Sequence, residues 1–282
     1  MIVLNNGILE VTISKFGAEI RKVVKDGKDR MWSGNPEHWA GVAPLLFPIC
    51  SGLPDDKYIY NGETYEMPKH GFIRKLPFEV EATADDTATF MFASNEETLK
   101  MFPWRFELRI KYTLIREKIK VEYFVLNKSE NTMYYSIGSH EGYDCPEGIE
   151  AYDVVFEKEE VLNNCLLDGA VLSGETEPIL LSGNVLPLKE AYFLKDALIF
   201  KNVESRKAAL VNRESGQKTI VSFPECEYLL LWHPVGAPFM CIEPWEGICS
   251  TKGDSGDITE KEGIIALDSK VEKVHTHIIE FR

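Results

Sequence analysis

Two neighbouring stretches decide the fold: Glu107-Leu108-Arg109-Ile110-Lys111-Tyr112 and Lys118-Ile119-Lys120-Val121-Glu122-Tyr123-Phe124-Val125. Both alternate polar and apolar residues with a period of two, which is typical of a β-strand with one face in water and one in the core. The short connection at Arg116-Glu117 is typical of a turn between two paired strands. The sequence therefore predicts an antiparallel hairpin here.

The rest of the chain repeats this pattern. Further strand candidates are short, rich in Val, Ile, Phe and Tyr, and separated by Gly, Pro, Asn or Asp. They are Val11–Ile13, Asp153–Phe156, Ala197–Phe200, Ala208–Val211, Thr219–Phe223, Tyr228–Trp232, Phe239–Ile242 and His277–Phe281.

Helix signals are few. Ser94-Asn95-Glu96-Glu97 is typical of a capping box that opens a short helix, which would end at Met101 before Pro103. Asn35–Ala40 is a second candidate for a single helical turn. No long 3.6-residue pattern supplies crossover helices for a parallel sheet. The prediction is an all-β antiparallel sandwich with few short helices, formed by residues 1–282 as one domain.

The composition excludes several classes of partner. The 282 residues include 31 Lys and Arg against 45 Asp and Glu, which gives a net charge of −14. Binding to nucleic acid or to an anionic membrane needs clustered positive charge, so neither is expected. No segment approaches the roughly 20 apolar residues of a membrane span. A neutral or cationic small molecule is the expected partner, and nothing in the sequence specifies an oligomeric state.

The cysteines and the N-terminus indicate a compartment. None of the six cysteines forms a C-x-x-C pair, and several lie in apolar runs. The first residues lack the basic region and long apolar run of a signal peptide. We expect a cytoplasmic protein with reduced, buried thiols.

Two histidines lie beside glycines and aromatic residues. His140 follows a predicted strand in Ser136-Ile137-Gly138-Ser139-His140-Glu141-Gly142-Tyr143, and His70 precedes Gly71-Phe72. Glycine lets the backbone approach a ligand closely, so both imidazoles are candidates for a binding site. An isolated histidine in such a place is more often a surface or turn residue, and the pattern alone leaves that interpretation open. Phosphate-binding glycine loops and the G-x-S-x-G elbow are absent.

Glu243 is the most unusual carboxylate, because it follows the apolar stretch Phe239–Ile242 and precedes Pro244-Trp245. A buried carboxylate must find hydrogen-bond donors or change its pKa. Such a group beside an indole suits a sugar, whose hydroxyls donate and whose ring face stacks on Trp245. A structural ion pair with a buried arginine explains the position equally well.

His275 and His277 share one face of a predicted strand. Two imidazoles are not a metal site without a third ligand, and none with suitable spacing is visible. We expect both histidines to be exposed or on an edge strand.

Four motifs in order match a known family: Phe47-Pro48-Ile49, Lys69-His70-Gly71-Phe72-Ile73-Arg74, Ser136-Ile137-Gly138-Ser139-His140 and Cys241-Ile242-Glu243-Pro244-Trp245. Over nearly the whole chain the sequence resembles the aldose 1-epimerase (galactose mutarotase) family, most closely its LacX-like branch. The resemblance implies a galactose-mutarotase-like β-supersandwich with a sugar cleft on a concave sheet. It also implies interconversion of the α and β anomers of a free aldose.

The resemblance also implies residue roles. His140 would protonate the ring oxygen of the sugar, and His70 would contact and orient it. One acid and one base suffice for this reaction, so neither a cofactor nor a metal is expected.

The base and one binding residue depart from the family pattern. The family's glutamate in a turn before the last strand would fall on Val271, and Glu272 is one residue late. A one-residue slip reverses the face of a strand residue, although a bulge restores it. We favour Glu272 as the base, with Glu243 as the second candidate.

The arginine that many relatives carry after Phe-Pro-Ile is also missing, because Ser51-Gly52-Leu53 stands there. Arg74 is the candidate replacement, and Asp196 is a further candidate carboxylate. Two alternatives stay open: a carbohydrate-binding protein that has lost its base, and a mutarotase of hexose phosphates.

Overall fold

The predicted hairpin lies inside the larger of two sheets. A computed structural model gives the structure of residues 1–282. In it β10 (Phe106–Ile115) pairs with β11 (Lys118–Asn127), and Arg116 in the connecting turn has a φ of 54°. Buried residues alternate with partly exposed ones along both strands. The hairpin prediction is therefore confirmed, and alternation with a period of two is its cause.

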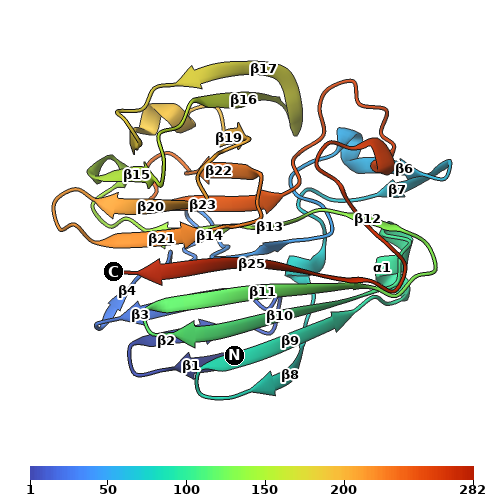
Figure 1. Cartoon of the computed structure of the whole chain (residues 1–282), viewed down its shortest axis with the longest axis horizontal. Helices are drawn as coiled ribbons and strands as arrows, with labels where there is room; N and C mark the ends of the chain where they lie inside the picture. Colours follow the sequence, from blue (N-terminus) through green and yellow to red (C-terminus); the bar gives the residue numbers. More distant parts are fainter.

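The larger sheet has nine strands, and every neighbouring pair is antiparallel. From one edge to the other its strands are β18 (Val185–Pro187), β15 (Tyr152–Phe156), β20 (Lys207–Asn212), β21 (Lys218–Ser222), β25 (Glu272–Phe281), β11, β10, β9 (Thr87–Ala93) and β8 (Glu79–Thr83). The last strand of the chain, β25, is therefore interior to the sheet, between β21 and β11 (Figure 1).

The second sheet has eight strands and is also antiparallel. Along its path lie β17 (Val171–Ile179), β16 (Leu162–Asp168), β19 (Leu198–Lys201), β22 (Tyr228–Trp232), β23 (Phe239–Glu246), β13 (Ile137–Ser139) and β5 (Leu45–Leu46), and β14 (Glu141–Asp144) pairs with β23 beside β13. Each further strand that the sequence predicts overlaps a strand of the structure.

Smaller units complete the molecule. A four-stranded sheet is formed by β1 (Ile2–Asn5), β2 (Leu9–Ile13), β3 (Ile20–Lys25) and β4 (Lys28–Asp29), and two pairs are formed by β6 (Lys57–Tyr60) with β7 (Glu63–Glu66) and β12 (Met133–Tyr135) with β24 (Ile265–Leu267). Five 3-10 turns are η1 (Pro54–Asp56), η2 (Ile73–Lys75), η3 (Ile149–Ala151), η4 (Glu190–Phe193) and η5 (Ile258–Glu260).

One short α-helix is present, α1 (Glu96–Met101). Its cap differs from the prediction, because Asn95 and not Ser94 accepts from the first-turn amides, and Thr98 closes the capping box. Near Asn35 the chain makes only a hydrogen-bonded turn. No helix is long and apolar enough to cross a membrane. The prediction of an all-β antiparallel sandwich with few short helices is confirmed.

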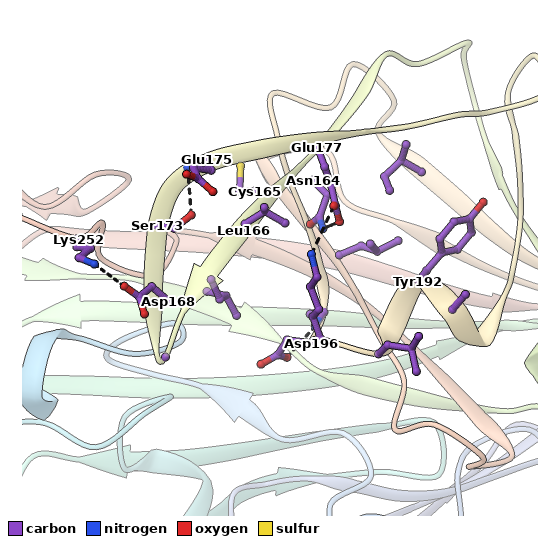
Figure 2. Close-up of a pocket in the computed structure, with 18 residues that line it drawn as sticks. Asn164, Cys165, Leu166, Asp168, Ser173, Glu175, Glu177, Tyr192, Asp196 and Lys252 are labelled. Carbon is purple, nitrogen blue, oxygen red and sulfur yellow. Dashed lines mark hydrogen bonds and ion pairs between the residues drawn. The ribbon is translucent and has the colours of Figure 1, made fainter.

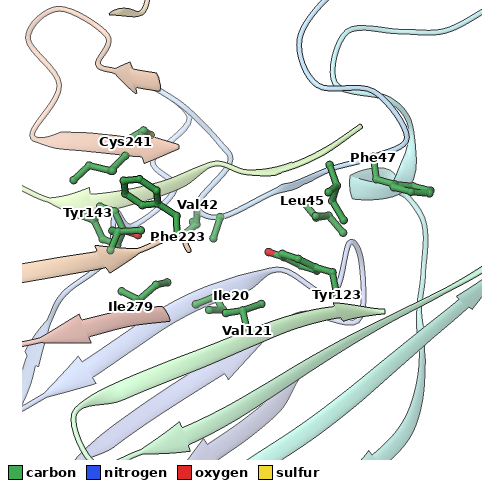
Figure 3. Close-up of a cluster of buried hydrophobic side chains, with 14 of the residues drawn as sticks. Ile20, Val42, Leu45, Phe47, Val121, Tyr123, Tyr143, Phe223, Cys241 and Ile279 are labelled. Carbon is green, nitrogen blue, oxygen red and sulfur yellow. The ribbon is translucent and has the colours of Figure 1, made fainter. Parts of the chain in front are cut away.

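The two large sheets form two layers, with the apolar core between them (Figure 1). Figure 3 shows Val121, Tyr123 and Ile279 of the nine-stranded sheet below Tyr143 of the other sheet. Ile20 joins the same cluster from the N-terminal sheet. All six cysteines are free, and all but Cys226 are buried. The opposite face of the eight-stranded sheet is left to form a site.

Candidate functional site

A break in one strand of the eight-stranded sheet creates the site. The sequence placed Glu243 after the end of a strand, and this is wrong, because β23 continues through Pro244 to Glu246. Pro244 has no N–H with which to bond a neighbouring strand. The segment that pairs with β23 on one side is divided here into two strands, β13 and β14. His140 is the one residue between them.

The register of the strands brings His140 to Glu243. Glu141 of β14 pairs with Ile242 of β23 in antiparallel register. The residue before Glu141 therefore lies opposite the residue after Ile242, on the same face of the sheet. Nδ1 of His140 is 3.4 Å from Oε1 of Glu243, and both side chains are buried.

This face of the sheet carries a cleft of about 410 Å³. It is lined by six of the seven candidate residues that the sequence singled out, from four separate segments of the chain. They are His70, Arg74, His140, Asp196, Glu243 and Trp245. The structure brings these six side chains together and leaves out Glu272.

Two indoles hold the imidazole of His140. The ring of Trp39 stacks on it at 4.9 Å between centroids, and that of Trp232 meets it edge-on at 5.3 Å. Burial lowers the pKa of His140 to about 3, and the positive charge of Arg74 adds to this effect. Nδ1 has no aligned hydrogen bond within the protein, although Glu243 is close. His140 is therefore a neutral, oriented imidazole at pH 7.

Glu243 has the opposite shift. Burial raises the pKa of Glu243 well above its usual range, and the nearby carboxylate of Glu141 adds to the rise. Its ion-pair partner is His140 and not a buried arginine. A carboxyl group with a raised pKa beside an imidazole with a lowered pKa favours a pair that shares a single proton. Such a pair can give one proton and accept another in the same step.

His70 is fixed as a hydrogen-bond donor. The backbone N–H of Ser51 donates to Nδ1 of His70 at 3.1 Å. Burial lowers the pKa of His70 well below its usual value, with the neighbouring His140 as the next cause. A neutral imidazole that accepts at Nδ1 carries its proton on Nε2. His70 therefore presents an N–H to a ligand in the cleft.

The backbone at His70 is strained to reach this position. His70 has a φ of 66°, in the left-handed region that non-glycine residues rarely adopt. The next residue is Gly71, where a Cβ would lie 2.2 Å from the carbonyl oxygen of Phe47. Only glycine allows this close approach, which explains the His-Gly pair in the sequence.

Trp245 is locked beside the pair. Its indole N–H donates to the carbonyl oxygen of Ser139 at 3.1 Å. Gly138 provides the space, because a Cβ there would lie 2.4 Å from Cδ1 of Trp245. The glycine that the sequence associated with ligand approach thus serves to seat an aromatic wall of the cleft.

Arg74 and Asp196 lie at the walls of the cleft. Nη2 of Arg74 donates to the carbonyl oxygen of Lys69 at 3.0 Å, and its buried Nε has no partner. Oδ1 of Asp196 accepts from the backbone N–H of Ala197 at 2.7 Å. Arg74 therefore lines the cleft. Ser51, from the segment in which many relatives carry an arginine, lines it as well.

Glu272 lies outside the cleft. It is the first residue of β25, exposed, and paired in register with Leu126 of β11. From Lys273 onward the odd-numbered residues of β25 face the core, so Glu272 shares the outer face with Val274. No bulge restores the one-residue slip, because β25 pairs with β11 without a register shift.

His275 and His277 are not on an edge strand, so that expectation is wrong. Both are 3% exposed on the interior strand β25, and each reaches across the core to a carboxylate. Nδ1 of His275 is 2.5 Å from Oε1 of Glu246, and Nε2 of His277 is 3.0 Å from Oε1 of Glu141. These two pairs join the nine-stranded sheet to the strands that carry His140 and Glu243.

Two groups of side chains have the geometry to hold a metal ion. One is His140, Cys241 and Glu243, whose ligand atoms lie within 4.8 Å of one another. The other is Glu225, Glu246 and His275. In the second group two of the members are already hydrogen-bonded to each other. The first group is the proton-sharing pair itself with a neighbouring thiol.

The sequence missed several residues of the cleft. Trp39, Lys69 and Trp232 line it, and Leu230 and Ile199 form part of its apolar floor. The only signal for Trp232 was its place on the predicted strand Tyr228–Trp232, two residues beyond Leu230 on the same face. Trp39 comes from a turn and gave no signal, because its contact with His140 spans about a hundred residues of chain.

The fold and the cleft together define a class. The two-sheet antiparallel sandwich, with a histidine and carboxylate cleft on one sheet, has the fold of galactose-mutarotase-like proteins. The sequence model of the aldose 1-epimerase family matches residues 1–262. The chain belongs to the aldose 1-epimerase family, as its motifs predicted.

Individual relatives support the same family and fold. The chain is 34% identical over 273 residues to protein LacX (plasmid) of Lactococcus lactis subsp. lactis, covering 91% of both chains. A galactose mutarotase related enzyme from Lactobacillus acidophilus is 30% identical, with a TM-score of 0.94 over 100% of this chain and 97% of the other. A galactose mutarotase-like protein from Lactobacillus casei is 28% identical, with a TM-score of 0.95 over 100% of both chains.

Proposed function

We propose that this protein is an aldose 1-epimerase that interconverts the α and β anomers of a free aldose. The observation that carries the proposal is the pair of His140 and Glu243, 3.4 Å apart in a cleft walled by indoles. The family and the mutarotase-like relatives support the reaction class. The substrate is a sugar with a free anomeric hydroxyl.

The reaction needs one proton removed and one supplied. The carboxylate of Glu243 takes the proton of the C1 hydroxyl, C1 becomes a carbonyl carbon, and the bond from C1 to the ring oxygen breaks. The imidazolium of His140 gives its proton to that ring oxygen. Rotation about the C1–C2 bond turns the other face of the aldehyde to the ring hydroxyl, and the same transfers in reverse close the ring. No proton is gained or lost overall.

The shared proton suits this exchange. A pair with one proton has two arrangements, carboxyl with imidazole and carboxylate with imidazolium. Ring opening converts the second arrangement into the first, and ring closure converts it back. Burial in the cleft favours the uncharged arrangement. Sugar hydroxyls that bond to the pair would reduce the cost of the charged one.

The other cleft residues suit sugar binding. The Nε2–H of His70 and the guanidinium of Arg74 are donors, and Asp196 is an acceptor for hydroxyls. Trp245 is only 2% exposed, so the partly exposed indoles of Trp39 and Trp232 offer the aromatic surface for the apolar side of a sugar ring. His70 and Arg74 contact the substrate in this proposal, and they transfer no proton.

Glu243 replaces Glu272 as the base in this proposal. A general base must lie within hydrogen-bond reach of the proton it removes. Glu243 lines the cleft, whereas Glu272 is exposed on the outer face of the other sheet. If Glu243 is the base, the position of Glu272 one residue after the family's glutamate has no effect on catalysis.

Polarimetry or exchange NMR tests the proposal. Freshly dissolved α-glucose or α-galactose should approach its equilibrium rotation faster with the protein than in buffer alone. If no aldose equilibrates faster, the protein is not a mutarotase. Binding of the same sugars without acceleration would instead identify a carbohydrate-binding protein on this fold.

A further inference from the structure

A second pocket borders the cleft. This outer pocket has a volume of about 880 Å³ and lies between the β16–β17 pair and the segment around η4 (Figure 2). It shares Leu167, Asp196 and Ala197 with the cleft as lining residues. The two spaces therefore meet along a common wall.

A bulge shapes the wall of the outer pocket. The register of β16 against β17 shifts between Cys165 and Leu167, so that successive residues no longer simply alternate between faces. As a result Cys165, Leu166 and Leu167 all line the outer pocket. Leu167 reaches the cleft as well.

The wall is also held by a buried amide. Asn164 is 5% exposed, and its Oδ1 accepts from the backbone N–H of Ile199 at 2.8 Å. Its Nδ2 donates to Oε1 of Glu177 at 3.1 Å. The amide thus joins β19, which carries part of the floor of the cleft, to β17, which encloses the outer pocket.

The charges in the outer pocket disfavour an anion. Its lining has two lysines against four carboxylates, Asp168, Glu175, Glu177 and Asp196. Nζ of Lys252 is 2.6 Å from Oδ2 of Asp168, and these two side chains point toward each other in Figure 2. Nζ of Lys195 is 3.8 Å from Oε2 of Glu177. Both cations are therefore already paired, and the remaining acceptors suit the hydroxyls of a neutral ligand.

We propose that the outer pocket binds a second sugar ring, so that the preferred substrate is a reducing disaccharide. This inference rests on the proposed function. The C1 hydroxyl of the reducing ring must stay free, because its proton is transferred, so the second ring is joined through another hydroxyl. His70, His140 and Glu243 do not line the outer pocket, so the extension leaves the proton-sharing pair clear. Single binding pockets usually measure about 300–1,000 Å³, so the outer pocket is a full site of its own.

Mutarotation kinetics on a matched set of sugars tests the inference. Maltose, cellobiose, lactose and melibiose all carry glucose at the reducing end and differ in the second ring or its linkage. We expect kcat/KM for at least one of them to exceed that for glucose by about tenfold. If glucose is as good as or better than all four, the inference is wrong, while the mutarotase proposal stands.

A filling variant assigns the effect to the outer pocket. Leu166→Trp places an indole in it and should lower the ratio of disaccharide to glucose kcat/KM by about tenfold. Val161→Trp is the control, because Val161 is 92% exposed just before β16 and lines neither space. Ser173→Trp fills the same pocket if the first variant does not fold. An unchanged ratio in a folded filling variant overturns the inference.

The inference stays testable if the protein accelerates no sugar. Isothermal titration of the same sugars into the wild-type chain and Leu166→Trp then replaces the kinetics. Tighter binding of a disaccharide than of glucose, lost in the variant, supports the outer pocket. Equal affinities for all five sugars contradict it.

Discussion

At the level of single residues, two buried groups share one proton in the proposed mechanism. His140 has a lowered pKa and Glu243 a raised one, and burial is the main cause of both shifts. Neither group alone suits acid and base chemistry at pH 7, but the pair holds the one proton that the reaction exchanges. Burial disfavours a charge on either group, and it therefore keeps the shared proton available for transfer to the sugar.

Substitution of the imidazole tests its role. His140→Asn keeps a polar group of similar size but removes the transferable proton, so kcat should fall by about 10²–10⁴-fold with a smaller change in KM. His38→Asn is the control, because His38 is exposed and outside the cleft. Equal kcat in both variants, measured by polarimetry, would show that His140 transfers no proton.

The pH dependence of kcat/KM follows from the directions of the two pKa shifts. A second proton on the pair must go to His140, whose pKa is lowered to about 3, so activity should persist well below pH 6.5. The shared proton is lost through Glu243, whose raised pKa places the alkaline limb well above 4.5. An acid limb near pH 6.5 in a polarimetric series would contradict this account.

The sequence identified most of the cleft, but Glu272, the base that it favoured, lies outside the cleft, whereas its second candidate Glu243 lines it. His70, His140 and Glu243 stood out because each lies beside glycine, proline or an aromatic residue. The predicted strand Phe239–Ile242 stopped before Glu243, whereas β23 continues to Glu246, and Glu243 lies opposite the gap between β13 and β14. That pairing joins segments about a hundred residues apart, and no local pattern contains it.

At the level of secondary structure elements, two histidines of β25 contact carboxylates on the strands that carry the cleft. Glu141, next to His140, pairs with His277, and Glu246, at the end of β23, pairs with His275. Buried carboxylates need such partners. The two histidines that the sequence placed at an edge therefore have a structural role in the core.

Breaking one of these pairs should cost stability. Glu141→Leu leaves His277 buried without its acceptor and should lower the free energy of unfolding by about 3–5 kcal/mol. The double variant Glu141→Leu/His277→Leu should be more stable than the single one, because no buried polar group is orphaned. Urea unfolding measures both, and Glu122→Leu, on β11, serves as a control with an expected change of about 0.5 kcal/mol.

A single variant no more destabilised than the control would show that the pair is unimportant. A double variant less stable than Glu141→Leu would show that the histidine contributes through other contacts.

The orientation of β25 explains why the C-terminal glutamate was misleading. The alternation that predicted His277–Phe281 as a strand extends back to Glu272 in the structure. With His275 and His277 inward, Glu272 must be outward. The odd spacing between Glu272 and the two histidines is visible in the sequence. It predicts the direction of Glu272 only once the histidines are known to point into the core.

At the scale of the whole molecule, alternation with a period of two predicted the fold class and most strands. It did not predict which strands are neighbours, because the order of the nine-stranded sheet joins β21 to β25 and β25 to β11 across long stretches of chain. The family resemblance supplied that architecture where local patterns could not.

The net charge of −14 repels anionic substrates over a long range. Long-range repulsion and the paired lysines of the outer pocket disfavour an anion. We expect kcat/KM for glucose to exceed that for glucose 6-phosphate and to be insensitive to salt, while the value for the phosphate rises as salt screens the repulsion. A preference for the phosphate at low salt would instead support a hexose-phosphate mutarotase.

In the proposed mechanism Glu243 is the base, and two matched variants test this role. Glu243→Gln and Glu272→Gln each replace one carboxylate by an amide of the same shape. Measured by polarimetry at saturating aldose, kcat should fall by about 10²–10⁴-fold in Glu243→Gln and stay within about twofold of wild type in Glu272→Gln. A large loss in Glu272→Gln with full activity in Glu243→Gln would contradict the account.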